Sequence, residues 1–170
     1  MTIATWITIL RFLIAPIMYL QLTSGSPHAM RWALALLLLA GFTDMLDGWV
    51  ARIRGEISEL GKTLDPLADK VVVLLFLIGL AVKWGLPLWM MWLYLIKEVI
   101  QVIASALILK KYEQLISANF WGKSATVCFF LGFILYALNR NIGLAIITIA
   151  IPWSIYAMFT YYQAYLLLKK

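Results

Sequence analysis

The sequence predicts an all-α fold, an integral membrane protein whose six transmembrane helices form a single domain over residues 1–170. Two observations predict it. Hydrophobic residues make up 64% of the chain and charged residues 13%, and the mean hydropathy of +0.92 lies outside the range of soluble domains. In addition, apolar runs of about 20 residues, the length that a hydrocarbon core of about 30 Å requires, account for nearly all of the chain.

The first three helices are expected at about residues 3–22, 30–52 and 61–82. The first run carries Arg11 in its middle and ends without a clear cleavage site, so it predicts a retained helix rather than a signal peptide. The sequence Gly25-Ser26-Pro27 predicts a turn before the second helix. Residues 53–60 are mixed and charged, which is typical of a short interfacial connection.

The last three helices are expected at about residues 88–109, 119–138 and 143–168. The turn at residues 83–87 precedes the fourth helix, which holds the charged pair Lys97-Glu98 near its centre. The single cysteine, Cys128, lies in the apolar fifth run, so the sequence proposes no disulfide or thiolate metal site.

The distribution of basic residues predicts the orientation. With the N-terminus inside, three basic residues fall in external segments, namely Arg31, Lys83 and Arg140. The cytoplasmic segments hold a larger set: Arg52, Arg54, Lys62, Lys110, Lys111, Lys123, Lys169 and Lys170. We therefore expect a multi-pass protein of the cell membrane with both termini in the cytoplasm. The net charge of +6 indicates attraction to anionic membrane lipids, and no nucleic-acid-binding motif is present.

All four aspartates of the chain lie between residues 44 and 69, between two long apolar runs. Asp44 and Asp47 are three apart and Asp65 and Asp69 four apart, so each pair lies on one face of a helix. If residues 53–60 turn the chain, the two faces meet. Small residues at Gly48, Ala51 and Gly61 then leave space beside an all-oxygen ligand set on the cytoplasmic side.

Such a group of carboxylates requires compensating positive charge. Two carboxylates about 4 Å apart repel by roughly 4 kcal/mol at an effective dielectric constant near 20. One or two divalent cations would offset this repulsion, and oxygen ligands without His or Cys suit Mg²⁺ or Mn²⁺. Arg52, on the same face as Asp44 and Asp47, is placed to hold a phosphate beside the metals.

The pattern D-x-x-D-G-x-x-A-R-x8-G-x3-D-x3-D, which we call the aspartate motif (residues 44–69), resembles the signature of the CDP-alcohol phosphotransferases. These are membrane enzymes of phospholipid synthesis, and every fixed position of their pattern is matched. The resemblance implies two divalent cations, Mg²⁺ or Mn²⁺, bound by Asp44, Asp47, Asp65 and Asp69, with Asp69 also acting as general base. It implies nucleotide contacts at Gly48, Ala51, Arg52 and Gly61, with a hydroxyl contact from Ser58, and a homodimer.

Over most of its length the chain is similar to bacterial phosphatidylglycerophosphate synthases. The similarity covers Thr8-x-x-Arg11, the stretch from Leu64 to Lys70, a basic residue before Glu98, and Gly122-Lys123. It departs at three positions, since Thr5 stands in place of an asparagine, Lys97 in place of an arginine and Ala125 in place of a second lysine.

From the residues themselves, Lys97 and Lys123 are predicted to bind the phosphate of a polar acceptor, and Thr8 and Arg11 to line the same cavity. For Lys97 the competing interpretation is a structural ion pair with Glu98 between helices. Because of these departures, the chain has fewer basic residues to bind the acceptor phosphate than these synthases have.

Three function classes are considered. The first is an enzyme that transfers a phosphatidyl group from CDP-diacylglycerol to an alcohol with release of CMP. Glycerol 3-phosphate is the favoured acceptor, and phosphatidylglycerol (giving cardiolipin) or inositol phosphate are the alternatives. The second is a divalent-cation transporter, which is disfavoured because no acidic residue follows Asp69 in the third helix and none occurs in the last two. A lipid-binding protein without catalysis is disfavoured because no motif position is degraded.

Overall fold

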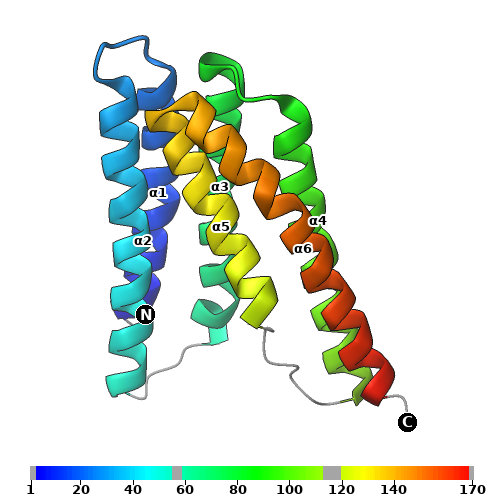
Figure 1. The fold of residues 1–170 in the computed structure, drawn as a ribbon. Helices are drawn as coiled ribbons and strands as arrows, with labels where there is room; N and C mark the ends of the chain where they lie inside the picture. Colours follow the sequence, from blue (N-terminus) through cyan, green and yellow to red (C-terminus); the bar gives the residue numbers. More distant parts are fainter. Residues whose placement is uncertain (1–2, 55–58, 113–119, 169–170) are drawn as a thin grey trace. The chain divides into compact units, whose positions relative to one another are not determined.

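In the computed structural model, the described part of the chain folds into six α-helices and no strands (Figure 1). The helices are α1 (Ile3–Thr23), α2 (Ala29–Arg54), α3 (Glu59–Trp84), α4 (Leu88–Tyr112), α5 (Phe120–Leu138) and α6 (Arg140–Leu168). The structure describes residues 3–54, 59–112 and 120–168. Within these ranges it does not describe the side chains of residues 3–6, 45, 47–54, 59–66, 104–112, 120, 161–162 and 164–168. The predicted all-α fold is confirmed.

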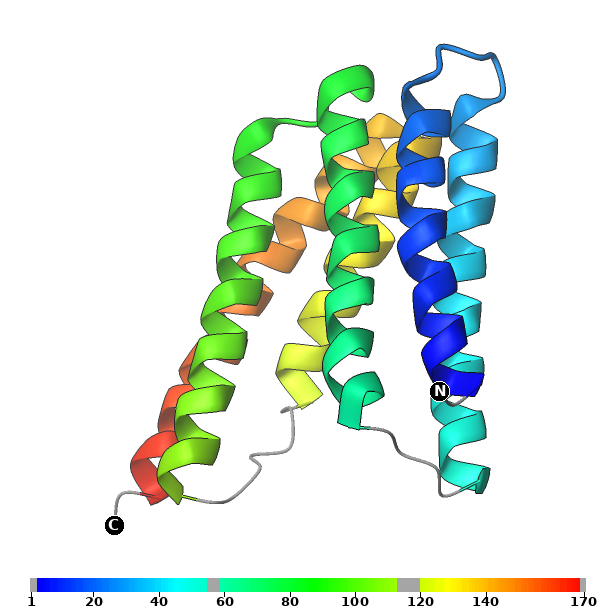
Figure 2. The same ribbon diagram turned by 180° about the vertical axis from the view of Figure 1, so that it is seen from behind.

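The first compact unit, Met1–Leu86, is organised around α1. Helix α1 packs against both α2 and α3, which contact each other less, and Figure 2 shows α1 between them from behind. Apolar side chains fill the centre of this unit, and the largest are Met18, Leu22, Leu37, Phe76, Leu77 and Leu80.

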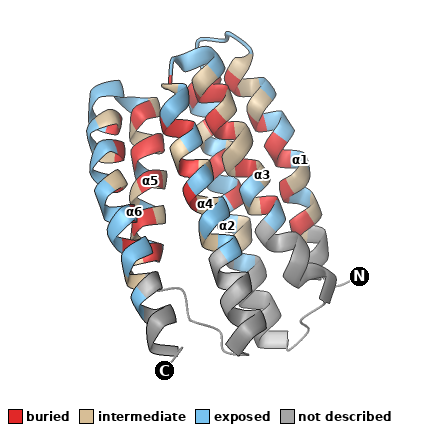
Figure 3. Cartoon of the chain, turned by 90° about the vertical axis from the view of Figure 1, so that its right-hand side faces the viewer, coloured by how far each residue is buried: buried red, intermediate tan, exposed pale blue. Residues whose placement is uncertain are grey.

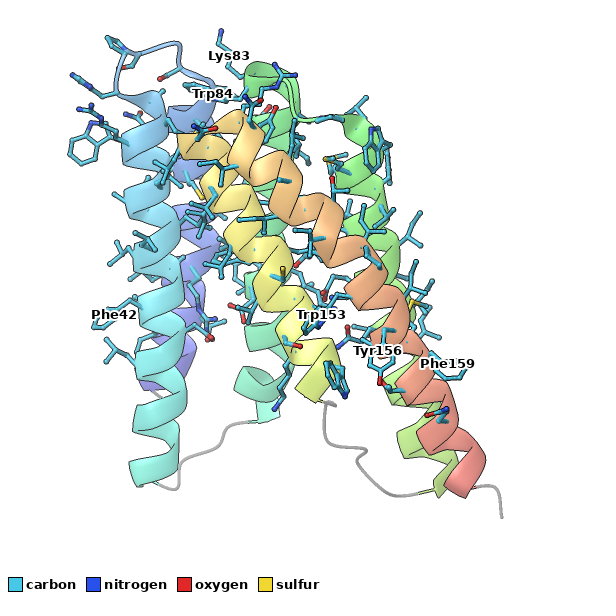
Figure 4. The ribbon with its side chains drawn as sticks, in the orientation of Figure 1. Phe42, Lys83, Trp84, Trp153, Tyr156 and Phe159 are labelled. Atoms are coloured by element: carbon cyan, nitrogen blue, oxygen red, sulfur yellow. The ribbon has the colours of Figure 1, made fainter. Side chains whose placement is uncertain are left out.

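Glycines lie in both predicted turns of this unit. Gly25 (φ +74°) follows α1 and Gly85 (φ +72°) follows α3, and this left-handed conformation is open to glycine without steric cost. The indole Nε1 of Trp84 donates a hydrogen bond of 3.1 Å to the carbonyl oxygen of Leu22. This hydrogen bond connects the C-terminus of α3 to the C-terminus of α1. Lys83 and Trp84, the last two residues of α3, are labelled in Figure 4.

The second compact unit, Pro87–Lys170, is built on the α5–α6 hairpin, against which α4 packs. Asn139 caps α6, because its Oδ1 accepts hydrogen bonds from the backbone N–H groups of Asn141 (3.1 Å) and Ile142 (3.3 Å). The ring of Tyr94 on α4 meets Phe129 and Phe133 on α5 edge-on, at centroid distances of 5.6 and 5.5 Å. Figure 3 shows the buried residues recurring along α5 and exposed ones along α6.

Two helices of the described part are long and apolar enough to cross a membrane, at Trp121–Leu138 and Arg140–Thr160. The shorter apolar segment Ile7–Thr23 lies in α1. Together these helices indicate a membrane protein. The prediction of six membrane spans stays a prediction, because two candidate spans are found among the described residues.

Candidate active site

Asp44 and Asp69, the first and last aspartates of the motif, meet at one nitrogen atom of Arg11. The guanidinium Nη1 lies 2.6 Å from Asp44 Oδ1 and also contacts Asp69 Oδ1. The three residues come from α2, α3 and α1, so the contact joins all three helices of the first unit. Arg11 and Asp69, which are 58 residues apart in the sequence, are therefore in direct contact.

The two sides of this cluster differ in exposure. The Arg11 side chain is fully buried, whereas the side chains of Asp44 and Asp69 each keep 46% of their surface exposed. The arginine therefore lies beneath the carboxylates. Burying a guanidinium is costly unless it is paired, and the two charge-assisted contacts supply that pairing.

The arrangement fits a hard divalent cation. Two carboxylate oxygens from different helices already converge on one cationic atom. Carboxylate ligands of this kind are typical for Mg²⁺ and Mn²⁺. Among the described side chains no group of three or more His, Cys, Asp or Glu residues gathers, so Asp44 and Asp69 are the described part of the predicted ligand set.

The other predicted site residues of the motif lie outside the described side chains, and they stay predictions. They are the metal ligands Asp47 and Asp65 and the nucleotide contacts Gly48, Ala51, Arg52, Ser58 and Gly61. Helices α2 and α3 nevertheless extend through Arg54 and from Glu59, so both halves of the motif have the helical backbone that the spacing argument requires.

Lys97 is held in a polar cluster inside the second unit. Its Nζ lies 2.6 Å from Glu98 Oε1 and 2.6 Å from Thr126 Oγ1 on α5, and 5.6 Å from the ring centroid of Tyr94. The side chain is 6% exposed. The ion pair with Glu98 lies within α4, and the contact between helices is the hydrogen bond to Thr126. Acceptor binding by Lys97 stays a prediction.

Lys123 is exposed on the first turn of α5, two residues after Trp121, which belongs to an aromatic cluster of α5 and α6. The ring of Trp121 lies 5.6 Å from that of Trp153 and 5.1 Å from that of Tyr156. Trp153 Nε1 donates a hydrogen bond of 3.0 Å to Ser124 Oγ. Trp153 and Tyr156 are labelled in Figure 4, one turn apart on α6.

Sequence reasoning placed Arg11 in a polar cavity but did not name its partners. The signal was present, since an arginine in an apolar helix usually pairs with an acidic or other polar group and all four aspartates lie in one stretch. Thr8, one turn before Arg11, is also fully buried. No sequence signal marked Thr126 as a partner of Lys97, because a threonine in an apolar helix is common.

Comparison with known proteins adds independent information. A family model described as CDP-alcohol phosphatidyltransferase matches residues 1–160. A cardiolipin synthase (CMP-forming) of Streptomyces coelicolor is 36% identical over 119 residues, which are 70% of this chain and 55% of that protein. A probable phosphatidylglycerophosphate synthase of Mycobacterium tuberculosis is 33% identical over 127 residues, 73% of this chain and 60% of the relative. A CDP-diacylglycerol–glycerol-3-phosphate 3-phosphatidyltransferase of Cereibacter sphaeroides is 38% identical over 85 residues, 49% of this chain and 38% of the relative.

Proposed function

Because the chain belongs to the CDP-alcohol phosphatidyltransferase family, we propose that it transfers a phosphatidyl group from CDP-diacylglycerol to an alcohol and releases CMP. The observation that carries the proposal is the convergence of Asp44 and Asp69 on Arg11. This contact brings the two ends of the motif together, as a site assembled from both halves requires. A transporter would need further acidic groups along its path, and the sequence contains none in α5 or α6.

The proposed reaction is a displacement at the phosphorus atom of the phosphatidyl group. The acceptor oxygen forms a bond to this phosphorus, and the phosphorus–oxygen bond to CMP breaks, so that CMP leaves with the electron pair. The proton of the acceptor hydroxyl passes to the carboxylate of Asp69, which acts as the general base. Asp69 is 46% exposed, so an acceptor has access to it.

Two divalent cations, Mg²⁺ or Mn²⁺, would neutralise the pyrophosphate and the leaving phosphate when bound. Asp44, Asp47, Asp65 and Asp69 would hold them. We assign the nucleotide to the small and polar residues of the motif, which are Gly48, Ala51, Arg52, Ser58 and Gly61. Arg52 suits a phosphate because its guanidinium offers planar paired donors.

Glycerol 3-phosphate is the acceptor we propose first, with phosphatidylglycerophosphate as the product. Two of the relatives carry names of this activity, and they match 73% and 49% of this chain. Lys123 is exposed and therefore available to a phosphate, with Lys97 as the second predicted acceptor contact. Thr8 and Arg11, both in the first unit, are the residues that we propose to line the cavity beside Asp69.

Phosphatidylglycerol is the second candidate acceptor, with cardiolipin as the product. The Streptomyces relative, 36% identical, bears the name of that activity. The pairing of Lys97 with Glu98 and Thr126 also favours it, because a phosphodiester carries less charge than a phosphomonoester and needs fewer cationic partners. Inositol phosphate is the further alternative within the same chemistry.

We further propose six membrane spans in one domain, a cytoplasmic active site, cytoplasmic termini and a homodimer. The helix lengths, 19 residues for α5 and 21–29 for the others, support the spans, since 20 helical residues extend about 30 Å. Helix α4 presents a stripe of exposed apolar residues that includes Trp92, Ile96, Val99 and Ile103, which suits a lipid-facing surface. The family model spans both units, which supports one domain.

The test is an acceptor screen with the full chain purified in detergent. The protein is incubated with CDP-diacylglycerol, Mg²⁺ or Mn²⁺, and glycerol 3-phosphate, phosphatidylglycerol or inositol phosphate, and the products are identified by mass. We expect metal-dependent CMP release and phosphatidylglycerophosphate with the first acceptor. Cardiolipin alone would establish the second candidate, and no CMP release with any acceptor would contradict the transferase proposal.

The Lys123→Ala variant tests the acceptor site in the same assay. A charged hydrogen bond to a phosphate contributes about 1.5–3 kcal/mol, so the KM for the acceptor should rise by about tenfold or more. The KM for CDP-diacylglycerol should change far less. Lys83→Ala, at an exposed lysine in the first unit, is the matched control. Unchanged acceptor kinetics in Lys123→Ala would exclude Lys123 from the site.

A further inference from the structure

One end of the first unit carries two exposed cations. Arg31 lies in the first turn of α2 and Lys83 in the last turn of α3, and both side chains are exposed. Lys83 Nζ lies 4.0 Å from the position that a Cβ atom on Gly25 would take, so this lysine lies against the turn that leads into α2. Lys83 is labelled at this end of the unit in Figure 4. Arg31 and Lys83 therefore belong to one end of the unit, which we call the basic end.

The acidic residues of the first unit lie too far along its helices to balance the basic end. Residues 1–43 and 70–86 contain no Asp or Glu, so the nearest acids along α2 and α3 are Asp44 and Asp69. Each lies about 20 Å from the basic end, at about 1.5 Å of rise per residue. This distance exceeds the Debye length of about 8 Å at physiological ionic strength. The positive charge of the basic end is therefore available to an anion from the surroundings.

A face of α2 that starts at the basic end is exposed and apolar. It holds exposed residues at helical spacing, namely Arg31, Ala35, Leu38 and Phe42. Leu38 is 62% and Phe42 58% exposed, and Figure 4 shows the ring of Phe42 pointing away from the neighbouring helices of the unit. From Arg31 to Phe42 the helix rises about 16 Å, which is close to half of a hydrocarbon core of about 30 Å. The face is therefore as long as one leaflet of a membrane and ends in positive charge.

We propose that the basic end and this face of α2 form a binding site for an anionic phospholipid of the outer leaflet. Arg31 and Lys83 bind the headgroup phosphate, and the face from Ala35 to Phe42 receives an acyl chain. Trp32, which follows Arg31 and is 59% exposed, suits the level of the headgroups, where tryptophan is enriched. The leaflet follows from the proposed orientation in the membrane, and the site is separate from the proposed transfer site.

The apolar face favours a lipid over a free phosphate ion. Two exposed cations alone hold a small anion weakly, because water and salt screen their charge. An acyl chain that lies along α2 keeps its phosphate beside the basic end and buries apolar surface of Leu38 and Phe42. The charge then distinguishes an anionic lipid from a zwitterionic one, by about fivefold in affinity for each basic residue.

The test is native mass spectrometry of the detergent-purified full chain with phosphatidylserine. This anionic lipid is neither the proposed donor nor a proposed acceptor. We expect Arg31→Gln and Lys83→Gln each to raise the Kd about fivefold, and the double substitution to raise it about 25-fold. Arg31→Lys keeps the charge and should stay near the wild type. Arg140→Gln, at an exposed arginine of the second unit, is the matched control and should leave the Kd unchanged.

Two further ligands test the charge and the acyl chain separately. Phosphatidylcholine, whose headgroup has no net charge, should bind the wild type about as weakly as phosphatidylserine binds the double variant. Glycerophosphoserine, the same headgroup without acyl chains, should not displace phosphatidylserine. Equal binding of the two lipids, or an equal loss in Arg140→Gln, would overturn the proposal. Displacement by glycerophosphoserine would also overturn it, because the site would then bind a simple anion.

CMP release in detergent without phosphatidylserine separates this site from the proposed active site. The basic end lies about 20 Å from Asp44 and Asp69 along their helices, so the kcat for CMP release should be unchanged in both glutamine variants. Charge-dependent phosphatidylserine binding in a protein that releases no CMP would remove the proposed function and support this site. CMP release together with charge-independent lipid binding would remove this site alone.

Discussion

At the scale of single residues, Asp44 and Asp69 share one partner but are assigned different roles. Both accept a hydrogen bond from Arg11 Nη1, and both are equally exposed. Their contacts and exposure therefore do not distinguish the proposed general base, Asp69, from Asp44, which is proposed as a metal ligand only. Substitutions can distinguish the two roles.

Asparagine substitutions separate these roles. Asp69→Asn keeps the shape and an oxygen that accepts from Arg11, but an amide cannot take up the acceptor's proton. We expect kcat to fall by about 10²–10⁴-fold while Mn²⁺ and nucleotide binding remain measurable. Asp44→Asn should instead weaken Mn²⁺ binding and recover part of its activity at high metal concentration. The measurement is CMP release at several Mn²⁺ concentrations.

A near-normal kcat for Asp69→Asn at saturating metal would remove the general-base role. Equal recovery of both variants by added Mn²⁺ would show that Asp69 acts only as a ligand. The two variants serve as controls for each other, because each loses one carboxylate from the same cluster.

At the scale of helices, glycines permit the close approach of α5 and α6. A Cβ atom on Gly132 would lie 2.8 Å from Ile147 Cγ1 and 3.2 Å from the Ile147 backbone nitrogen. A Cβ on Gly143 would overlap the backbone of Tyr136. Both positions lie in the hairpin that carries Lys123 and the aromatic cluster.

Alanine at these glycines should destabilise the hairpin. Over-packing typically costs about 1–3 kcal/mol, and we expect Gly143→Ala to cost more than Gly132→Ala because backbone atoms cannot move aside. Gly41→Ala on α2 is the matched control, because no atom lies within 4 Å of its Cβ position and alanine favours a helix. The measurement is thermal unfolding in detergent. A Gly143→Ala protein as stable as Gly41→Ala would contradict the tight packing.

At the scale of the whole molecule, the proposed topology predicts which connections face the cytoplasm. In a Cys128→Ala background, His28→Cys should react with a membrane-impermeant maleimide in intact cells. Glu113→Cys, in the connection after α4, should react only after the membrane is permeabilised. Labelling of Glu113→Cys in intact cells would reverse the orientation and place the connection away from cytoplasmic nucleotide.

The sequence by itself determined the class of the fold, the six helices to within a few residues, and the family. Hydropathy and helical length depend on local composition, and glycine and asparagine mark the ends at Gly25, Gly85 and Asn139. The aspartate motif predicted the family from sequence alone, because its spacing can be read directly from the chain. The family-model match over residues 1–160 confirmed that prediction. The ligand roles of the motif's four aspartates stay predictions.

The tertiary structure decided which charges meet. Periodicity along a helix gives the face on which a residue lies but not the helix that packs against that face, so the contact of Arg11 with Asp44 and Asp69 required the packing of α1 against α2 and α3. In the same way, Lys97 was one residue from Glu98 in the sequence, but its bond to Thr126 depended on how α4 packs on α5. Local sequence determines helices because backbone hydrogen bonds are local, whereas an ion pair between helices depends on which helices pack together, and burial makes it costly to leave the charge unpaired.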